Sequence, residues 1–129
     1  MSMAGPLVSI GNLSIALPIG GDRAHAVEDV SFEMAPGEIV CVVGESGSGK
    51  SVAASTLMGL LPHGLRIASG RVEFAGEDLA HADEKRLRAL RGREVSMIFQ
   101  EPLSALNPLY RVGDQIAELM DAHGAYPGK

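Results

Sequence analysis

The pattern of apolar and polar positions predicts several strands in the first part of the chain. Residues 7–17 are apolar-rich with β-branched side chains, and residues 29–34 alternate strictly between apolar and polar. A period of two is typical of a half-buried strand. Residues 66–74 look like a further strand. Turn-forming residues separate these segments, at 18–22, at Pro36-Gly37 and at 76–78.

Two shorter segments predict strands of another kind. Residues 39–43 form a continuous apolar run with β-branched side chains, which is typical of a strand buried on both faces of a parallel sheet. Residues 94–99 are predicted to be a strand that ends before Pro102. Cys41 lies in the first run, so we expect it to be a small buried side chain. As the single cysteine it excludes an internal disulfide and fits a reducing compartment.

Helical spacing of apolar residues follows in three places. Residues 51–61 predict a helix that ends at Pro62 and Gly64. Asp83 can cap a short helix that runs to about Arg91. Residues 112–122 predict a final amphipathic helix, with one apolar face made by Val112, Ile116, Leu119 and Met120.

Length and composition narrow the class of protein. The 129 residues suffice for one modest domain, and 46% hydrophobic residues place the chain in the globular range. The net charge of −5 and the 4% of aromatic residues argue against nucleic-acid binding. Four arginines cluster, but acidic residues flank them, so we interpret them as a solvated helix face: Arg86, Arg88, Arg91 and Arg93. We find neither a signal peptide nor an apolar stretch of the ~20 residues that would cross a bilayer.

Residues 44–51 carry the clearest chemistry. Their sequence, GESGSGKS, matches the phosphate-binding pattern G-x-x-x-x-G-K-[ST]. Glycines let the backbone curl so that many N–H groups converge on a phosphate, and a helix N-terminus adds to the anion site. Lys50 is expected to reach the β- and γ-phosphates, and the Ser51 hydroxyl to take one position on Mg²⁺. The pattern alone leaves open which class of phosphate-binding protein this is.

A second motif lies fifty positions after Lys50 (100 − 50), where Gln100 follows the predicted strand 94–99. With it, the chain resembles the ATP-binding-cassette (ABC) ATPases, and in particular the importers of oligopeptides, dipeptides or nickel. The resemblance rests on HAVEDVSFEMAPGEIVCVVGESGSGKS, on GRVEFAG at 70–76 and on MIFQEPLSALNP. It covers nearly all of the chain.

The resemblance implies an α/β fold of the P-loop NTPase class. Residues 1–129 would be the N-terminal part of an ABC-type ATPase core with an antiparallel β subdomain, from the Walker A motif to the Q-loop and the start of the helical subdomain. It implies ATP and Mg²⁺ as cofactors. It also implies membrane permease subunits and a second ATP-binding subunit as partners, and a peripheral place on the cytoplasmic face of the inner membrane.

The family's functional residues carry over onto matching positions. The nucleotide would be held by Gly44, Glu45, Ser46, Gly47, Ser48, Gly49, Lys50, Ser51 and Val52. Gln100 would approach Mg²⁺ and the attacking water, and residues 101–110 would lie near the membrane subunit. Lys50 and Gln100 are thus the implied catalytic residues, and Ser51 and Gln100 the implied metal-contacting residues.

Two departures from the family pattern change the expectation. The position where an aromatic side chain commonly stacks on adenine matches Leu17, with His25 as a neighbouring substitute. The LSGGQ-type signature, the apolar strand ending in Asp-Glu and the switch histidine are not found in these 129 residues; we interpret His63, His81 and His123 as solvated. We therefore expect an incomplete domain that binds nucleotide weakly, does not hydrolyse it, and exposes apolar strand edges that favour association.

Other functions remain open from the residues. A stand-alone P-loop kinase would need a basic lid and an acceptor site, and no lid is evident. A non-hydrolysing nucleotide-binding or regulatory module, such as a regulator of intact ATPases, is a further alternative. A soluble ABC ATPase acting on nucleic acid is disfavoured by the acidic balance.

Overall fold

The structure, a computed structural model, describes residues 5–124. It consists of two compact units, Met1–Arg88 and Ala89–Lys129, and each is treated by itself below. Among the described residues, no helix is both long enough and apolar enough to pass through a membrane.

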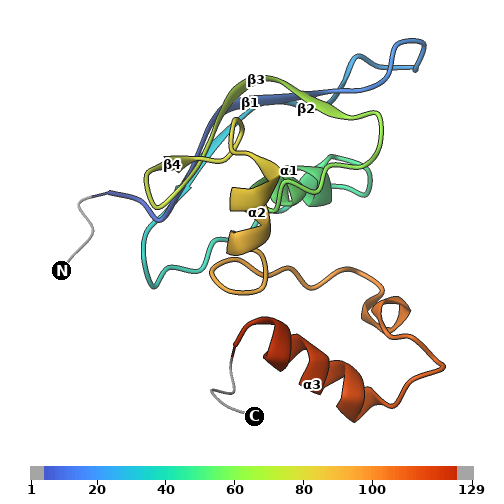
Figure 1. The fold of residues 1–129 in the computed structure, drawn as a ribbon. Helices are drawn as coiled ribbons and strands as arrows, with labels where there is room; N and C mark the ends of the chain where they lie inside the picture. Colours follow the sequence, from blue (N-terminus) through green and yellow to red (C-terminus); the bar gives the residue numbers. More distant parts are fainter. Residues whose placement is uncertain (1–4, 125–129) are drawn as a thin grey trace. The chain divides into compact units, whose positions relative to one another are not determined.

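An antiparallel sheet forms the first unit (Figure 1). Its strands lie in the order β2-β1-β3-β4, so β1 is flanked on both sides. The strands are β1 Val8–Ala16, β2 His25–Met34, β3 Arg66–Phe74 and β4 Glu77–Asp78. The strand predictions for 7–17 and 66–74 are confirmed. The second strand begins four residues earlier than predicted, since pairing of Ala16 with His25 extends the hairpin beyond the alternating segment.

A local irregularity interrupts the sheet at the level of Asn12. The backbone at Asn12 and Asp29 has φ of 47° and 49°, and the register shifts on both sides of β1. The Asn12 side-chain amide donates to Asp29 Oδ1 at 2.8 Å, which holds the two positions together. Gly70 on β3 approaches the backbone of Leu13 so closely that a Cβ there would stand 2.5 Å from the Leu13 Cα. Bulges of this kind increase strand twist.

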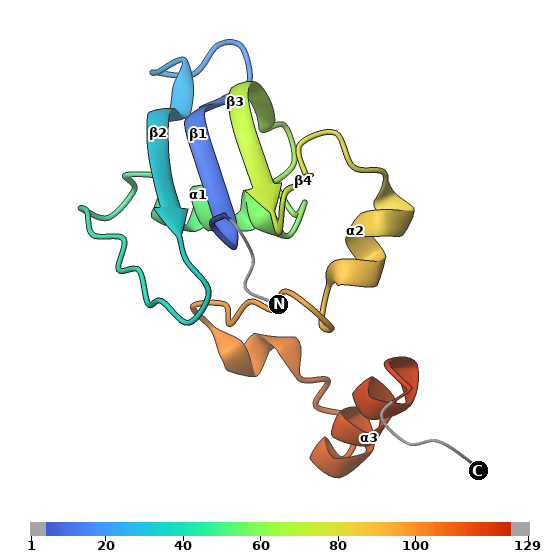
Figure 2. The same ribbon diagram turned by 90° about the vertical axis from the view of Figure 1, so that its left-hand side faces the viewer.

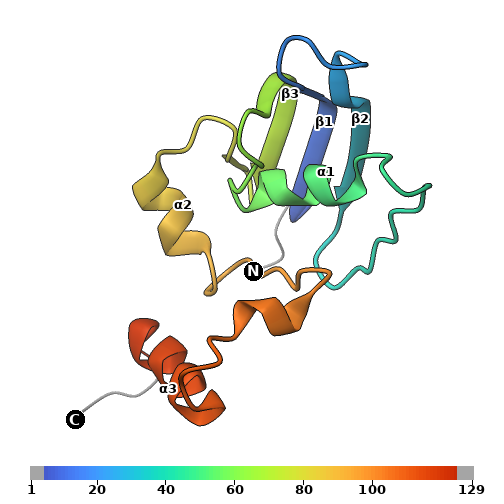
Figure 3. The ribbon, with the colours of Figure 1, turned by 90° about the vertical axis from the view of Figure 1, so that its right-hand side faces the viewer.

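Helix α1, Lys50–Leu57, packs on one face of the sheet (Figures 2 and 3). The sheet contributes the most deeply buried side chains to this core, Ile10, Leu13, Ile15 and Val72, and the helix contributes Ala53 and Thr56. The helix ends before the predicted Leu61. Gly59 has φ of 59°, and Leu60 N donates to Ser55 O at 3.0 Å, so a Schellman-type cap stops the helix there.

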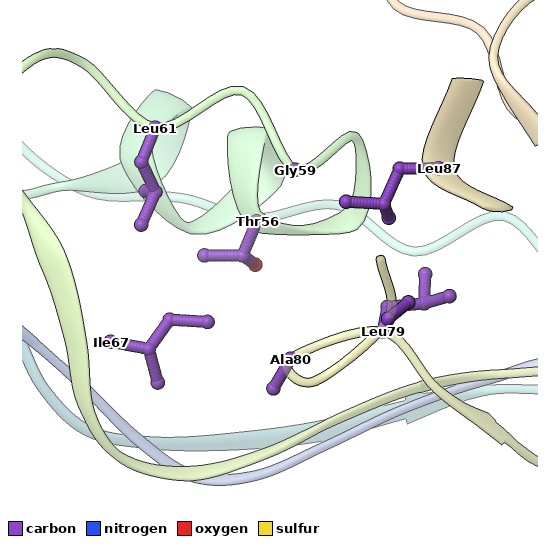
Figure 4. A pocket seen from close by; sticks show the side chains of 8 residues that line it. Thr56, Gly59, Leu61, Ile67, Leu79, Ala80 and Leu87 are labelled. Carbon is purple, nitrogen blue, oxygen red and sulfur yellow. The ribbon is translucent and has the colours of Figure 1, made fainter. Parts of the chain in front are cut away.

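The packing between α1 and the sheet is incomplete at the C-terminal end of the helix. A cavity of about 200 Å³ lies there. Figure 4 shows side chains around it from α1, β3 and α2, from the loop after α1 and from the loop between β4 and α2. Its lining is Thr56, Gly59, Leu61, Ile67, Leu79, Ala80, Ala82 and Leu87. Helix α2, Glu84–Leu90, begins as predicted after Asp83, whose carboxylate accepts from Arg86 N at 2.8 Å.

The predictions of strands at 39–43 and 94–99 are wrong for this structure. Neither segment belongs to a strand, and only an isolated bridge between Arg91 and Val95 touches the second. Ile39 is 90% exposed and Ile98 is 89% exposed. An apolar run becomes a buried strand only when neighbouring strands hydrogen-bond to it, and no described strand does so here. For the same reason Cys41, expected to be buried, is exposed.

The second unit contains a 3₁₀ turn, Pro102–Ala105, and helix α3, Val112–Ala122, whose bounds match the predicted helix. The Gln115 side chain ties the preceding loop to this helix, because its amide donates to Asn107 O at 3.0 Å and accepts from Asn107 N at 2.9 Å. The predicted apolar face is present, and its residues Ile116 and Leu119 are more than half exposed.

Candidate functional site: a phosphate-binding loop on helix α1

The glycine-rich loop leads directly into the first turn of α1. Gly47 and Gly49 have φ of 79° and 91°, values at which a side chain is strained. Gly49 is the N-cap of α1, and its carbonyl accepts from Ala53 N at 2.8 Å, which closes the first turn. The loop therefore places backbone N–H groups and the helix N-terminus side by side, which is the arrangement that binds anions.

Gly49 is also the point where the loop touches the sheet. A Cβ at this position would lie 2.8 Å from Val27 Cγ2 and would collide with the Ala26 carbonyl oxygen. Only glycine lets α1 start this close to β2. The contact anchors the helical end of the loop, whereas residues 39–43 at its other end have no strand partner among the described strands.

Lys50 turns its side chain back into the loop. Its Nζ donates to Gly44 O at 2.7 Å, to Glu45 O at 2.6 Å and to Ser48 Oγ at 3.2 Å. These three oxygens are neutral acceptors, and together they hold the side chain in the curl of the loop. A cation fixed among converging backbone groups is the expected feature of a polyphosphate site.

The remaining predicted loop residues are mostly exposed. Ser51 and Val52 lie in the first turn of α1, with Ser51 exposed and Val52 half-buried. The other loop side chains are open to solvent: Glu45, Ser46 and Ser48. The Ser51 hydroxyl, next to Lys50 and unobstructed, is the oxygen in this loop best suited to a Mg²⁺ ion.

Gln100 belongs to the second unit. It is exposed, follows residues 94–99 and lies two residues before the turn Pro102–Ala105. Its approach to the phosphate-binding loop stays a prediction, since it depends on how the two units are arranged.

The β1–β2 hairpin lies next to the loop. Leu17 N donates to Ala24 O at 2.9 Å and closes the hairpin, and Leu17 and His25 are both half-buried. An open hollow of about 400 Å³ is lined by residues 17–24. Arg23, which the sequence patterns did not single out, reaches from this hairpin to the loop, and its Nη2 donates to Gly47 O at 3.3 Å. An arginine in a turn has no periodic signal, so only the fold could have revealed this contact.

The three histidines interpreted as solvated are exposed in the structure. His81 lies 2.6 Å from Asp78 Oδ2, and its hydrogen bond lowers the pKa of the Asp78 carboxyl below the ordinary value. Within residues 5–124 no group of three potential metal ligands comes together.

A lysine held inside a glycine-rich loop at the start of a helix is the arrangement of the P-loop class of proteins. Within that class, the family model described as "ABC transporter" matches residues 27–126, and the chain belongs to this family.

Several curated relatives are similar over most of the chain. A peptidoglycan transport ATP-binding protein from Agrobacterium fabrum is 47% identical over 95% of this chain and 23% of its own length. A dipeptide transport ATP-binding protein from Bacillus subtilis is 42% identical over 91% of this chain and 35% of its own length. A probable D,D-dipeptide transport ATP-binding protein from Escherichia coli is 45% identical over 94% of this chain and 37% of its own length. The chain thus spans about a quarter to a third of the length of these relatives.

A solved structure supports the same fold. A bacterial Atm1-family ABC exporter with ATP bound superposes with a TM-score of 0.53 at 33% identity, covering 71% of this chain and 15% of the exporter chain. The expectation of an ABC-type ATPase core with an antiparallel β subdomain is confirmed.

Proposed function

We propose that this chain binds ATP together with Mg²⁺ through the loop at 44–51. The observation that carries the proposal is the placement of Lys50, whose ammonium is held inside the loop by hydrogen bonds to three neutral oxygens, and an anionic phosphate would replace these bonds. The backbone N–H groups of Gly47 and Gly49 would face the phosphates, and Ser48 N–H would join them by leaving its bond to Glu45 O, with Ser46 and Val52 at the border of the site. Ser51 would give one oxygen to Mg²⁺, and Gln100 a second, catalytic contact.

The biological setting that we propose is the energy-coupling part of a peptide-type importer. Relatives named for peptidoglycan, dipeptide and D,D-dipeptide transport support it. The partners would be membrane permease subunits and a second ATP-binding subunit, which would form a homodimer or a heterodimer with this chain. The chain would then work at the cytoplasmic face of the membrane, held there by the permease.

Equilibrium binding of MgATP to the 129-residue chain, followed by calorimetry, tests the nucleotide site. We expect Lys50→Ala to lower the affinity at least tenfold, because it removes a charge-assisted contact to the phosphates. Lys85→Ala on the exposed face of α2 is the matched control, and it should bind like the unaltered chain. Equal binding by the unaltered chain and Lys50→Ala would refute the proposed site.

Capture by a permease separates the importer from other roles. Family membership speaks against a stand-alone kinase, whereas a non-hydrolysing regulatory module would still bind nucleotide. Co-purification with the permease subunits of a peptide importer supports the importer. Binding to an intact ABC ATPase subunit, without the permease, would favour the regulatory module.

A further inference from the structure

Arg23 makes a long-range contact that the loop motif does not explain. Its guanidinium crosses from the β1–β2 hairpin to the carbonyl of Gly47, 24 positions along the chain. The hydrogen bond from Leu17 N to Ala24 O closes the hairpin one residue after Arg23. The pairing of β1 with β2 therefore sets the position of the Arg23 backbone beside the loop.

The contact resembles that of Lys50 in its chemistry. Lys50 donates to the carbonyls of Gly44 and Glu45 near the start of the loop, and Arg23 donates to Gly47 at its middle. Two cations thus hold the same loop at different points through neutral oxygens. Phosphate oxygens are anionic and form shorter, stronger hydrogen bonds with a guanidinium than a peptide carbonyl does.

The charge of Arg23 is available for such an exchange. Among residues 5–124, no carboxylate lies within ion-pair distance of Arg23, and its side chain is exposed. The bond to Gly47 is long at 3.3 Å, so an anion in the loop would compete well with it. The hollow of about 400 Å³ along residues 17–24 leaves the side chain room to reorient.

We infer that Arg23 is a second cationic ligand of the polyphosphate in this site. It contacts the phosphate chain from the hairpin side, opposite the loop start that Lys50 holds. The inference rests on the proposed nucleotide site and adds to it a residue outside the motif. Because the ligand is the phosphate chain and not the base, inorganic tripolyphosphate is bound through the same contact.

Calorimetric titrations with magnesium tripolyphosphate and with MgATP test this assignment on the 129-residue chain. Arg23→Ala is expected to weaken both ligands by about tenfold, the effect of losing one charge-assisted hydrogen bond. Arg23→Lys keeps the charge and is expected to recover part of the loss. Arg71→Ala, an exposed arginine on β3 whose Nε lies 3.5 Å from Glu73, is the matched control and should leave both affinities unchanged. Circular dichroism verifies that each variant is folded.

The two ligands distinguish the outcomes. A loss for MgATP alone would place Arg23 on the base or ribose and overturn the assignment, as would unchanged binding of both ligands. If the unaltered chain binds neither ligand, the proposed function fails and the role of Arg23 fails with it. If Lys50→Ala weakens binding and Arg23→Ala does not, only the inference is wrong.

Discussion

Gly49 lies so close to Val27 that no side chain fits between the start of α1 and β2: a Cβ on Gly49 would stand 2.8 Å from Val27 Cγ2, at a backbone φ of 91°. This contact joins the helical end of the phosphate-binding loop to the sheet, and the Arg23–Gly47 hydrogen bond joins the middle of the loop to the β1–β2 hairpin. The position of the loop therefore depends on a residue that has no side chain to contribute.

Gly49→Ala is predicted to destabilise the chain by about 2–4 kcal/mol, since a strained left-handed residue and an overlap with β2 add together. Urea unfolding followed by circular dichroism measures the loss. Gly47→Ala is the matched control: its φ is 79°, but a Cβ there meets no atom within 4 Å. It should cost only the backbone strain, about 1–2 kcal/mol. Equal losses for the two variants would contradict the role given to the Val27 contact.

The pair of Glu77 and Arg86 predicts a dependence of stability on pH. Arg86 donates to Glu77 through Nε at 2.8 Å and Nη2 at 2.7 Å, and this hydrogen bonding holds the pKa of the Glu77 carboxyl below its ordinary value of 4.5. A lowered folded-state pKa stabilises the fold at pH values above the ordinary pKa. That contribution is lost as the pH falls from 4.5 through the folded-state value.

Glu77→Gln tests this prediction by acid titration of the free energy of unfolding. The substitution should lower stability at pH 7, where the pair is ionised, and have little effect at the acid end, where Glu77 is protonated in both states. The Asp78–His81 pair remains in the variant, so part of the acid sensitivity should persist. A constant difference between the two proteins from pH 7 to pH 3 would argue against the ion pair.

The exposed apolar run at 39–43 predicts self-association. Ile39 and Val43 are 90% and 91% exposed, and none of the described strands pairs with their segment. Replacing both by threonine should reduce the weight-average molecular mass measured by analytical ultracentrifugation at high protein concentration. The same variant should change the free energy of unfolding by less than about 0.5 kcal/mol. Val27→Thr, at a site that is 4% exposed, is the buried comparison and should cost about 1–3 kcal/mol. A large loss of stability in the Ile39/Val43 variant would show that the run is packed in solution.

Phosphate release from MgATP is predicted to stay at the background level for the 129-residue chain. The prediction rests on the resemblance: the signature motif and the apolar strand ending in Asp-Glu, whose Glu would polarise the attacking water, are not found in these 129 residues. Turnover at the rate of intact ABC ATPases that disappears with Lys50→Ala would contradict this expectation.

Local patterns predicted the fold best. Strands β1 and β3 lie where apolar, β-branched segments indicate them, within one residue at each end, and helix α3 has the bounds that helical spacing indicates. The sequence predicts that α1 ends at Pro62, but the cap at Gly59 ends it earlier. Residues 39–43 have the apolar, β-branched composition of a buried strand but no strand partner among the described strands. Composition indicates that a segment is suited to a buried strand, and it does not show whether neighbouring strands are there to pair with it.

The candidate site divides along the same line. The loop and Lys50 could be recognised from a motif whose spacing encodes its geometry. Arg23 could not, because its contact with Gly47 depends on how the hairpin folds beside α1. Gln100 is recognised by resemblance alone, and its role needs a contact between units.

The exposure of Cys41 turns the unpaired run into a built-in reporter. It is the single thiol of the chain and lies three residues before Gly44, so a maleimide probe would label one known position without mutagenesis. Its labelling rate measures how often residues 39–43 are covered. Slower labelling after adding a permease or a partner subunit would show that the partner covers residues 39–43.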